Sequence, residues 1–145
     1  MFVVDTNILI YAADSHVPEH ARCRELLLNW RSQISPWYLT WGIIYEFLRV
    51  STHPNVFRKP LKLIEGWNFM ETLLASPSLE ILQETDHHHQ VASEIFKEHP
   101  VILGNLLFDA HTVVLMKEHG IRKIYTRDAD FHRFKFIDVL DPLSS

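Results

Sequence analysis

Hydrophobic and polar positions along the chain alternate between helix-like segments and short strand-like runs. The clearest helical pattern, Asn105–His119, is followed by Gly120, a residue typical of helix C-termini. Ser35-Pro36 is a typical helix start, and we expect that helix to run to about Ser51. Further helices are predicted from Ile8 onwards and over Pro18–Arg31, Pro60–Ala75 and Asp86–Glu98, with a helical turn over Ala129–Phe134. Strands are predicted over Phe2–Val4, Leu79–Leu82, Lys123–Thr126 and Ile137–Leu140.

Strands that are separated by helices favour a parallel sheet with helices on both faces, so the predicted fold class is α/β. In such sheets, ligands bind beyond the carboxyl ends of the strands. Asp5 and Asp128 each come just after a predicted strand. The pattern therefore places two carboxylates at the edge of the sheet where a functional site is expected.

The chain has 145 residues, which favours a single domain over residues 1–145. Its 47% hydrophobic and 22% charged residues are typical of globular proteins and argue against disorder. The single cysteine, Cys23, cannot form an intramolecular disulfide. The longest uncharged run, Ser32 to Tyr45, is too short and too polar to span a bilayer. With no basic segment at the N-terminus, we expect a cytoplasmic protein without a membrane partner.

The net charge of −4 changes the picture of possible partners. A basic surface is the usual sign of nucleic-acid binding, and the overall composition does not provide one. The basic residues can still cluster locally, for example at Arg49, Arg58, Lys59 and Lys62. We therefore expect weak binding to bulk nucleic acid, and selection of a structured target if RNA is bound.

Two further acids, Glu46 and Asp109, lie within apolar helical stripes, where a charge is costly unless it is paired. Asn105 is one turn before Asp109 and lies on the same face. The apolar neighbours at helical spacing are Leu39, Ile43 and Val50 for Glu46, and Leu106, Val113 and Met116 for Asp109.

Each acid has a plain structural explanation. Glu46 can pair with Arg49 one turn on, and the other three acids can each cap a helix. The alternative is a shared site, in which converging carboxylates repel one another unless they are protonated or neutralised by a cation. Oxygen ligands select Mg²⁺ or Mn²⁺. Four separate structural roles for four acids are the weaker explanation. We therefore predict that the four acids form one metal-binding site.

Four segments in order carry a resemblance to a known family. The chain resembles the PIN-domain ribonucleases, and within them the VapC-type toxins of bacterial toxin–antitoxin pairs. The resemblance covers nearly the whole chain; each motif is weak alone, but their order and spacing are specific. The segments are Asp5-Thr6-Asn7, Glu46-Phe47-Leu48-Arg49-Val50, Asn105-Leu106-Leu107-Phe108-Asp109-Ala110-His111 and Thr126-Arg127-Asp128-Ala129-Asp130-Phe131.

The resemblance implies a three-layer α/β/α PIN-like domain with a central parallel sheet, and a Mg²⁺-dependent endoribonuclease in which Mn²⁺ can substitute. It also implies an RNA substrate, an antitoxin protein that covers the active site, and a homodimer. The catalytic and metal-binding residues would be Asp5, Glu46, Asp109 and Asp128. Residues that would steady these carboxylates or a water are Asn7, Thr126, Asp130 and Asn105, although Asp130 could also assist or replace Asp128.

Other functions fit the sequence less well. An aspartyl phosphatase needs a second acid two residues after Asp5, where Asn7 stands. A phospho-receiver domain needs a lysine after the end of one of the last strands, whereas Lys123 stands at the beginning of its strand. A non-catalytic PIN-like scaffold or RNA-binding module is the main alternative, but all four acids are kept.

The run His87-His88-His89 is interpreted as a solvated helix start, and His53, His111 and His132 are left out of the site.

Overall fold

The computed structural model describes residues 1–144 and is built around a five-stranded sheet in which every pair of neighbouring strands is parallel. The strand order is β3-β2-β1-β4-β5, so the N-terminal strand lies at the centre. The strands are β1 (Phe2–Val4), β2 (Trp37–Thr40), β3 (Leu79–Leu82), β4 (Lys123–Tyr125) and β5 (Asp138–Leu140).

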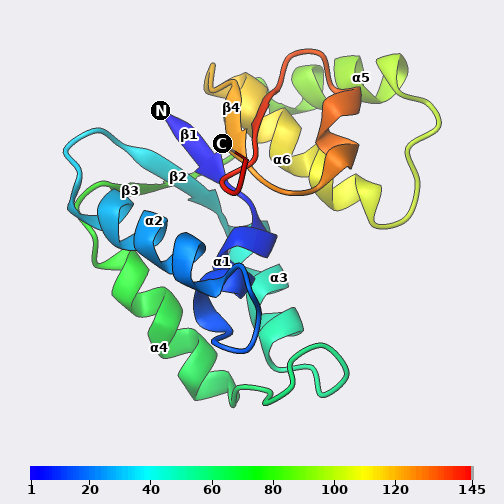
Figure 1. Cartoon of the computed structure of the whole chain (residues 1–145). Helices are drawn as coiled ribbons and strands as arrows, with labels where there is room; N and C mark the ends of the chain where they lie inside the picture. Colours follow the sequence, from blue (N-terminus) through cyan, green and yellow to red (C-terminus); the bar gives the residue numbers. More distant parts are fainter. Residues whose placement is uncertain (145) are drawn as a thin grey trace.

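Helices flank this sheet, which gives the predicted three-layer α/β/α arrangement. In Figure 1, α1 to α4 gather in the lower part of the view and α5 and α6 in the upper right, with the strands between them. The helices are α1 (Thr6–Ala13), α2 (His20–Ser32), α3 (Trp41–Ser51), α4 (Leu63–Leu74), α5 (His88–Glu98) and α6 (Leu106–Glu118), followed by the 3₁₀ helix η1 (Ala129–Arg133).

Most of the predicted elements are confirmed, with shifts of a few residues at their ends. The helix predicted up to His119 ends at Glu118, and Gly120 follows it with a φ of 68°. This left-handed conformation suits glycine, because a side chain there would be strained. The local signals therefore located α6 and its end correctly.

The prediction of one helix from Ser35-Pro36 to Ser51 is wrong. Trp37–Thr40 forms β2, and the helix begins only at Trp41. All four residues of β2 are buried between its neighbours β1 and β3, a position that suits aromatic and β-branched side chains. The Thr40 hydroxyl then accepts a hydrogen bond from Ile43 N at 3.0 Å and caps α3. Leu39 is consequently a strand residue and not a helical neighbour of Glu46.

Large apolar side chains pack tightly on both faces of the sheet. Trp37, Phe47 and Phe131 are fully buried, and Trp30 packs against Trp37 with ring centroids 6.0 Å apart. The Trp37 indole donates a hydrogen bond to Ser78 Oγ at 3.0 Å, which satisfies its buried N–H. This core holds the carboxyl ends of β1 and β4 in a fixed register, with Val4 opposite Tyr125.

Candidate metal-dependent active site

Asp5 and Thr126 meet where β1 and β4 end side by side. The Asp5 backbone N–H donates to the Tyr125 carbonyl at 3.0 Å, which continues the pairing of the two strands by one residue. The Thr126 hydroxyl then donates to Asp5 Oδ2 at 2.8 Å. Asp5 is 8% exposed and Thr126 is fully buried, so this contact fixes the carboxylate inside the protein.

Further hydrogen bonds join Asp5 to Asp128 through the same threonine. Asn7 Nδ2 lies 3.4 Å from Asp5 Oδ2 and 3.1 Å from Thr126 Oγ1, and donates to both. The Thr126 hydroxyl accepts from the backbone N–H of Asp128 at 2.9 Å. Asn7 and Thr126, which were expected to steady the carboxylates, both donate hydrogen bonds to Asp5.

Helices α3 and α6 bring the other two acids to the same place. Glu46 comes from α3 and Asp109 from the first turn of α6, and both line one open cavity with Asp5 and Asp128. The cavity has a volume of about 360 Å³, and Asn105 also lies on its wall. The structure therefore brings all four predicted acids to one cavity.

Three carboxylates, two of them from the cavity wall, lie close to one another. One oxygen each from Asp109, Asp128 and Asp130 lies within 4.8 Å of the others, a spacing that suits a shared cation. Asp128 Oδ1 accepts from the Asp130 backbone N–H at 2.9 Å, which holds the turn that brings both acids forward. Asp130, expected to assist or replace Asp128, lies in this group. Asp5 and Glu46, which were expected as metal ligands, lie outside it.

Burial and mutual repulsion make two of the acids weak. Burial raises the pKa of Asp5 to about 6, although hydrogen bonds from Thr126 and the Thr6 backbone oppose the rise. Burial also raises the pKa of Asp109 to about 7, and the charges of Asp5 and Asp128 add to that effect. Within residues 1–144, neither Asp5, Asp109 nor Asp128 forms an ion pair with a lysine or arginine. The donor set therefore fits a hard divalent cation, which would relieve the repulsion.

The plain structural explanations hold for three of the four acids. Arg49 donates to Glu46 from Nε at 3.0 Å and from the terminal guanidinium nitrogen at 2.6 Å. Asp5 caps α1 by accepting from Thr6 N at 2.8 Å, and Asp128 caps η1. Asp109 is not a cap, because α6 begins three residues earlier. Capping and convergence at one cavity are compatible, so the local roles do not argue against the shared site.

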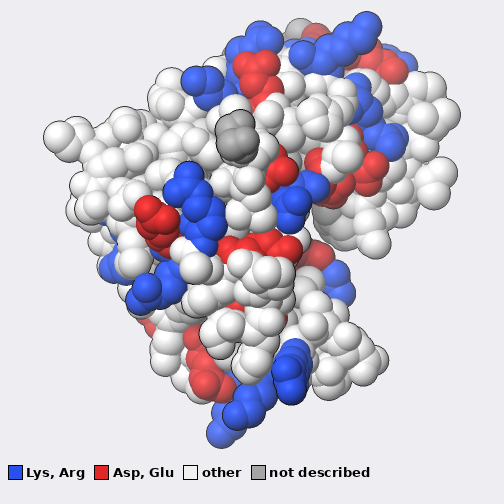
Figure 2. All heavy atoms as spheres, in the orientation of Figure 1, with Lys and Arg blue, Asp and Glu red and all other residues white. Residues whose placement is uncertain are grey.

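Several side chains on the cavity wall were not predicted from the sequence. Tyr11 lies one turn after Asn7 on α1, a spacing that could have indicated it. Phe108 is 71% exposed beside Asp109. Leaving His111 out of the site was wrong, because this side chain also lines the wall. Figure 2 shows acidic and basic side chains together around a hollow on the right of the face in view. Arg49, which pairs with the cavity-lining Glu46, provides one basic group beside the cavity despite the negative net charge.

Comparisons with known proteins agree with this geometry. The PIN domain family model matches residues 2–137, and the chain belongs to the PIN-domain family. "Ribonuclease VapC48" of Mycobacterium tuberculosis is 31% identical, covering 97% of this chain and 96% of the relative. "Ribonuclease VapC43" of the same species is 30% identical over 99% of this chain and 96% of the relative. These relatives place the chain, within that family, among the VapC proteins.

Solved structures show the same fold. Mycobacterium tuberculosis VapC20, described as a sarcin-ricin loop cleaving toxin, has a TM-score of 0.69 at 18% identity, covering 97% of this chain and all of that one. VapBC from Salmonella typhimurium, solved bound to DNA, gives 0.65 at 16% identity and covers 97% of each chain. None of the helices within residues 1–144 has the length and apolarity needed to cross a membrane.

Proposed function

We propose that this protein is a Mg²⁺-dependent endoribonuclease, with Mn²⁺ able to substitute, and the toxin of a VapBC-type toxin–antitoxin pair. The observation that carries the proposal is the convergence of Asp5, Glu46, Asp109 and Asp128 on one open cavity. The names of the curated relatives, which are VapC ribonucleases, support hydrolysis of RNA. An RNA substrate also favours a cytoplasmic location.

In the proposed mechanism, Asp109, Asp128 and Asp130 would hold the cation, and Asp5 and Glu46 would complete the negative wall of the cavity. A bound divalent ion supplies a water of lowered pKa and stabilises the charge that develops on the phosphate. The Thr126 and Asn7 side chains keep the Asp5 carboxylate in a fixed orientation. Hydrolysis by this route would join the water oxygen to phosphorus and break the bond to the 3′ oxygen. That oxygen would take a proton, which would leave a 5′-phosphate and a 3′-hydroxyl.

The cavity wall also offers contacts for a substrate beyond the phosphate. The exposed ring of Phe108 stands next to Asp109, where a base of a single-stranded or looped RNA can stack on it. Tyr11 and Asn105 add hydrogen-bonding groups to the wall. Such contacts favour a folded RNA with a splayed base over duplex nucleic acid.

Cleavage of total cellular RNA tests the proposal directly. The purified chain, separated from any co-purifying protein, is incubated with Mg²⁺ or with EDTA, beside Asp109→Asn and Glu71→Gln variants. Glu71 is an exposed acid of α4, so its variant is the matched control. Discrete fragments with Mg²⁺ from the wild type and the control, and none in the other lanes, are expected. Cleavage that survives EDTA or the Asp109 variant would refute the proposed site.

An antitoxin partner is proposed from exposed apolar side chains on the cavity wall or close in sequence to residues of that wall. Leu103 and Phe108 are more than 70% exposed, and Tyr45 is 69% exposed. Structures of related fold are described as VapBC complexes, which supports a partner of this kind. Co-purification with the small protein encoded beside it should be lost in a Leu103→Asp variant that still cleaves RNA.

A homodimer is proposed by analogy, and light scattering of the purified chain tests it.

A further inference from the structure

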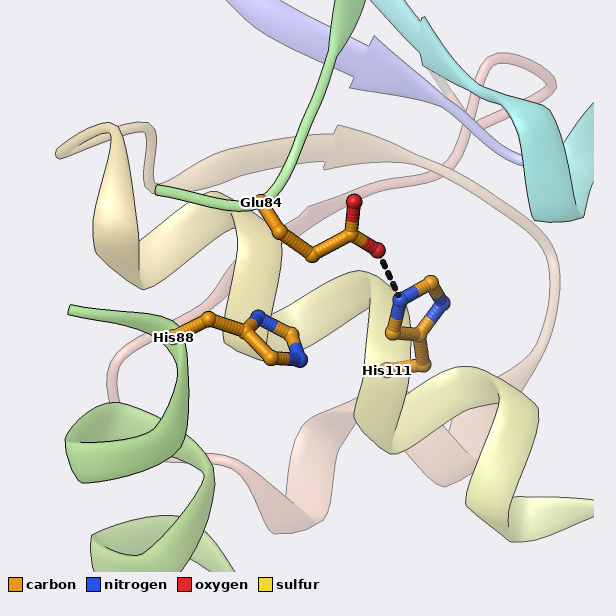
Figure 3. A group of neighbouring side chains, drawn as sticks. All are labelled: Glu84, His88 and His111. Atoms are coloured by element: carbon orange, nitrogen blue, oxygen red, sulfur yellow. Dashed lines mark hydrogen bonds and ion pairs between the residues drawn. The ribbon is translucent and has the colours of Figure 1, made fainter. Parts of the chain in front are cut away.

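A second group of metal-ligating side chains lies outside the acidic group. Glu84 follows β3, His88 begins α5 and His111 lies on α6. One ligand atom from each lies within 4.8 Å of the others, and Figure 3 shows the three side chains converging. We propose that Glu84, His88 and His111 bind a transition-metal dication of the Zn²⁺ type. This site shares no ligand with the Mg²⁺ site, although His111 also lines that cavity.

His88 is already oriented for this role by a buried carboxylate. Its Nδ1 lies 2.7 Å from Glu118 Oε2, and the Glu118 side chain has no solvent exposure. Glu118 also accepts from the Thr85 backbone at 2.9 Å and from the Thr85 hydroxyl at 2.7 Å. A carboxylate that accepts three hydrogen bonds places the imidazole proton on Nδ1 and leaves the lone pair on Nε2. This carboxylate–histidine pairing is the usual support of a metal-binding histidine.

His111 and Glu84 supply the other two ligand atoms at a suitable separation. His111 Nε2 lies 3.1 Å from Glu84 Oε1, and the two rings of His88 and His111 meet edge to face with centroids 5.9 Å apart. Ligands about 2.0–2.1 Å from a tetrahedral ion lie roughly 3.3 Å from each other. An ion can therefore take the place of the proton shared by His111 and Glu84 with small movements of exposed side chains.

The donor set decides the class of metal. Two imidazole nitrogens and one carboxylate favour Zn²⁺, Co²⁺ or Ni²⁺, whereas Mg²⁺ prefers oxygen alone. Three protein ligands leave the fourth tetrahedral position open to solvent, as in sites that keep a water. The ion would tie the segment before α5 to α6, the helix that carries Asp109. This inference does not depend on the proposed ribonuclease activity.

Zn²⁺ titration by calorimetry tests the site in the full chain without a histidine tag. The background is an Asp109→Asn, Asp128→Asn variant, which removes carboxylates of the acidic group. One Zn²⁺ per chain is expected to bind and to raise the melting temperature, and Co²⁺ should give the visible absorption of tetrahedral coordination. Separate His88→Asn and His111→Asn changes should each weaken binding at least tenfold. His89→Ala, an exposed neighbour, is the matched control and should not weaken it.

Two further variants keep the test decisive if a histidine variant is poorly folded by circular dichroism. Glu84 is 54% exposed in its side chain, so Glu84→Gln should fold normally and still lose affinity. Glu118→Gln does not touch the metal and should weaken binding about 10- to 100-fold by releasing His88. Absence of a one-to-one Zn²⁺ complex, or undiminished binding in the folded Glu84 and histidine variants, would overturn the inference.

Discussion

Replacing Asp109 by asparagine should stabilise the metal-free protein while it abolishes cleavage. Burial and neighbouring acids raise the pKa of Asp109 to about 7 from an ordinary value of 3.8. The folded state therefore holds a proton that the unfolded chain has released between these two pH values, so stability falls as pH rises through this window. Asparagine has nearly the same shape and no proton to lose, and no hydrogen bond within residues 1–144 uses the Asp109 carboxylate.

The size of the effect follows from the distance between the two pKa values. The pKa values of Asp109 in the folded and unfolded chain differ by about three units. If the whole difference acts on the free energy of unfolding, the wild type loses about 4 kcal/mol at pH 8. The side chain is only half-buried, so solvent screening reduces this to about 2 kcal/mol. At pH 5 the carboxyl is protonated in the folded state, and the same reasoning leaves about 1 kcal/mol or less.

Thermal and urea unfolding in EDTA at pH 5 and pH 8 measure this difference. For a chain of this length, about 2 kcal/mol corresponds to a melting temperature about 4–8 °C higher for Asp109→Asn at pH 8. Glu71→Gln, an exposed acid outside the cavity, should show no such gain. Excess Mg²⁺ should stabilise the wild type more than the variant. An Asp109 variant that is no more stable than wild type at pH 8, or equally stabilised at pH 5, would refute the reasoning.

Three other changes test the contacts around the site and the core. Thr126→Val removes the hydroxyl that binds Asp5, so unfolding in urea should show a loss of about 1–3 kcal/mol and cleavage at pH 7 should fall, with Thr126→Ser as the control that retains both. Ser78→Ala leaves the Trp37 indole N–H unpaired and should cost about 1–3 kcal/mol without changing the specific cleavage rate. Arg49→Gln removes an exposed ion pair worth about 1 kcal/mol or less, and the released carboxylate should lower the Mg²⁺ concentration needed for half-maximal cleavage.

Local signals predicted most elements because their boundaries depend on nearby residues. The end of α6 depends on Gly120, and the strand β1 is a short apolar run followed by a capping acid. The same reasoning failed at Trp37–Thr40, because Ser35-Pro36 is a good helix start in isolation. Burial of that segment between β1 and β3 decides for a strand, and this burial is a property of the assembled sheet.

The sequence by itself determined the α/β class, because strand–helix alternation is visible locally. It also singled out the four acids that line one cavity, by their places after strands and in apolar stripes. Only the tertiary structure decided which acids stand closest together. It brings Asp130 into the group with Asp109 and Asp128, and it links Asp5 to Asp128 through Thr126. It also joins His88 to His111 across two helices. Such distances depend on how α5 and α6 pack on the sheet, which no local pattern contains.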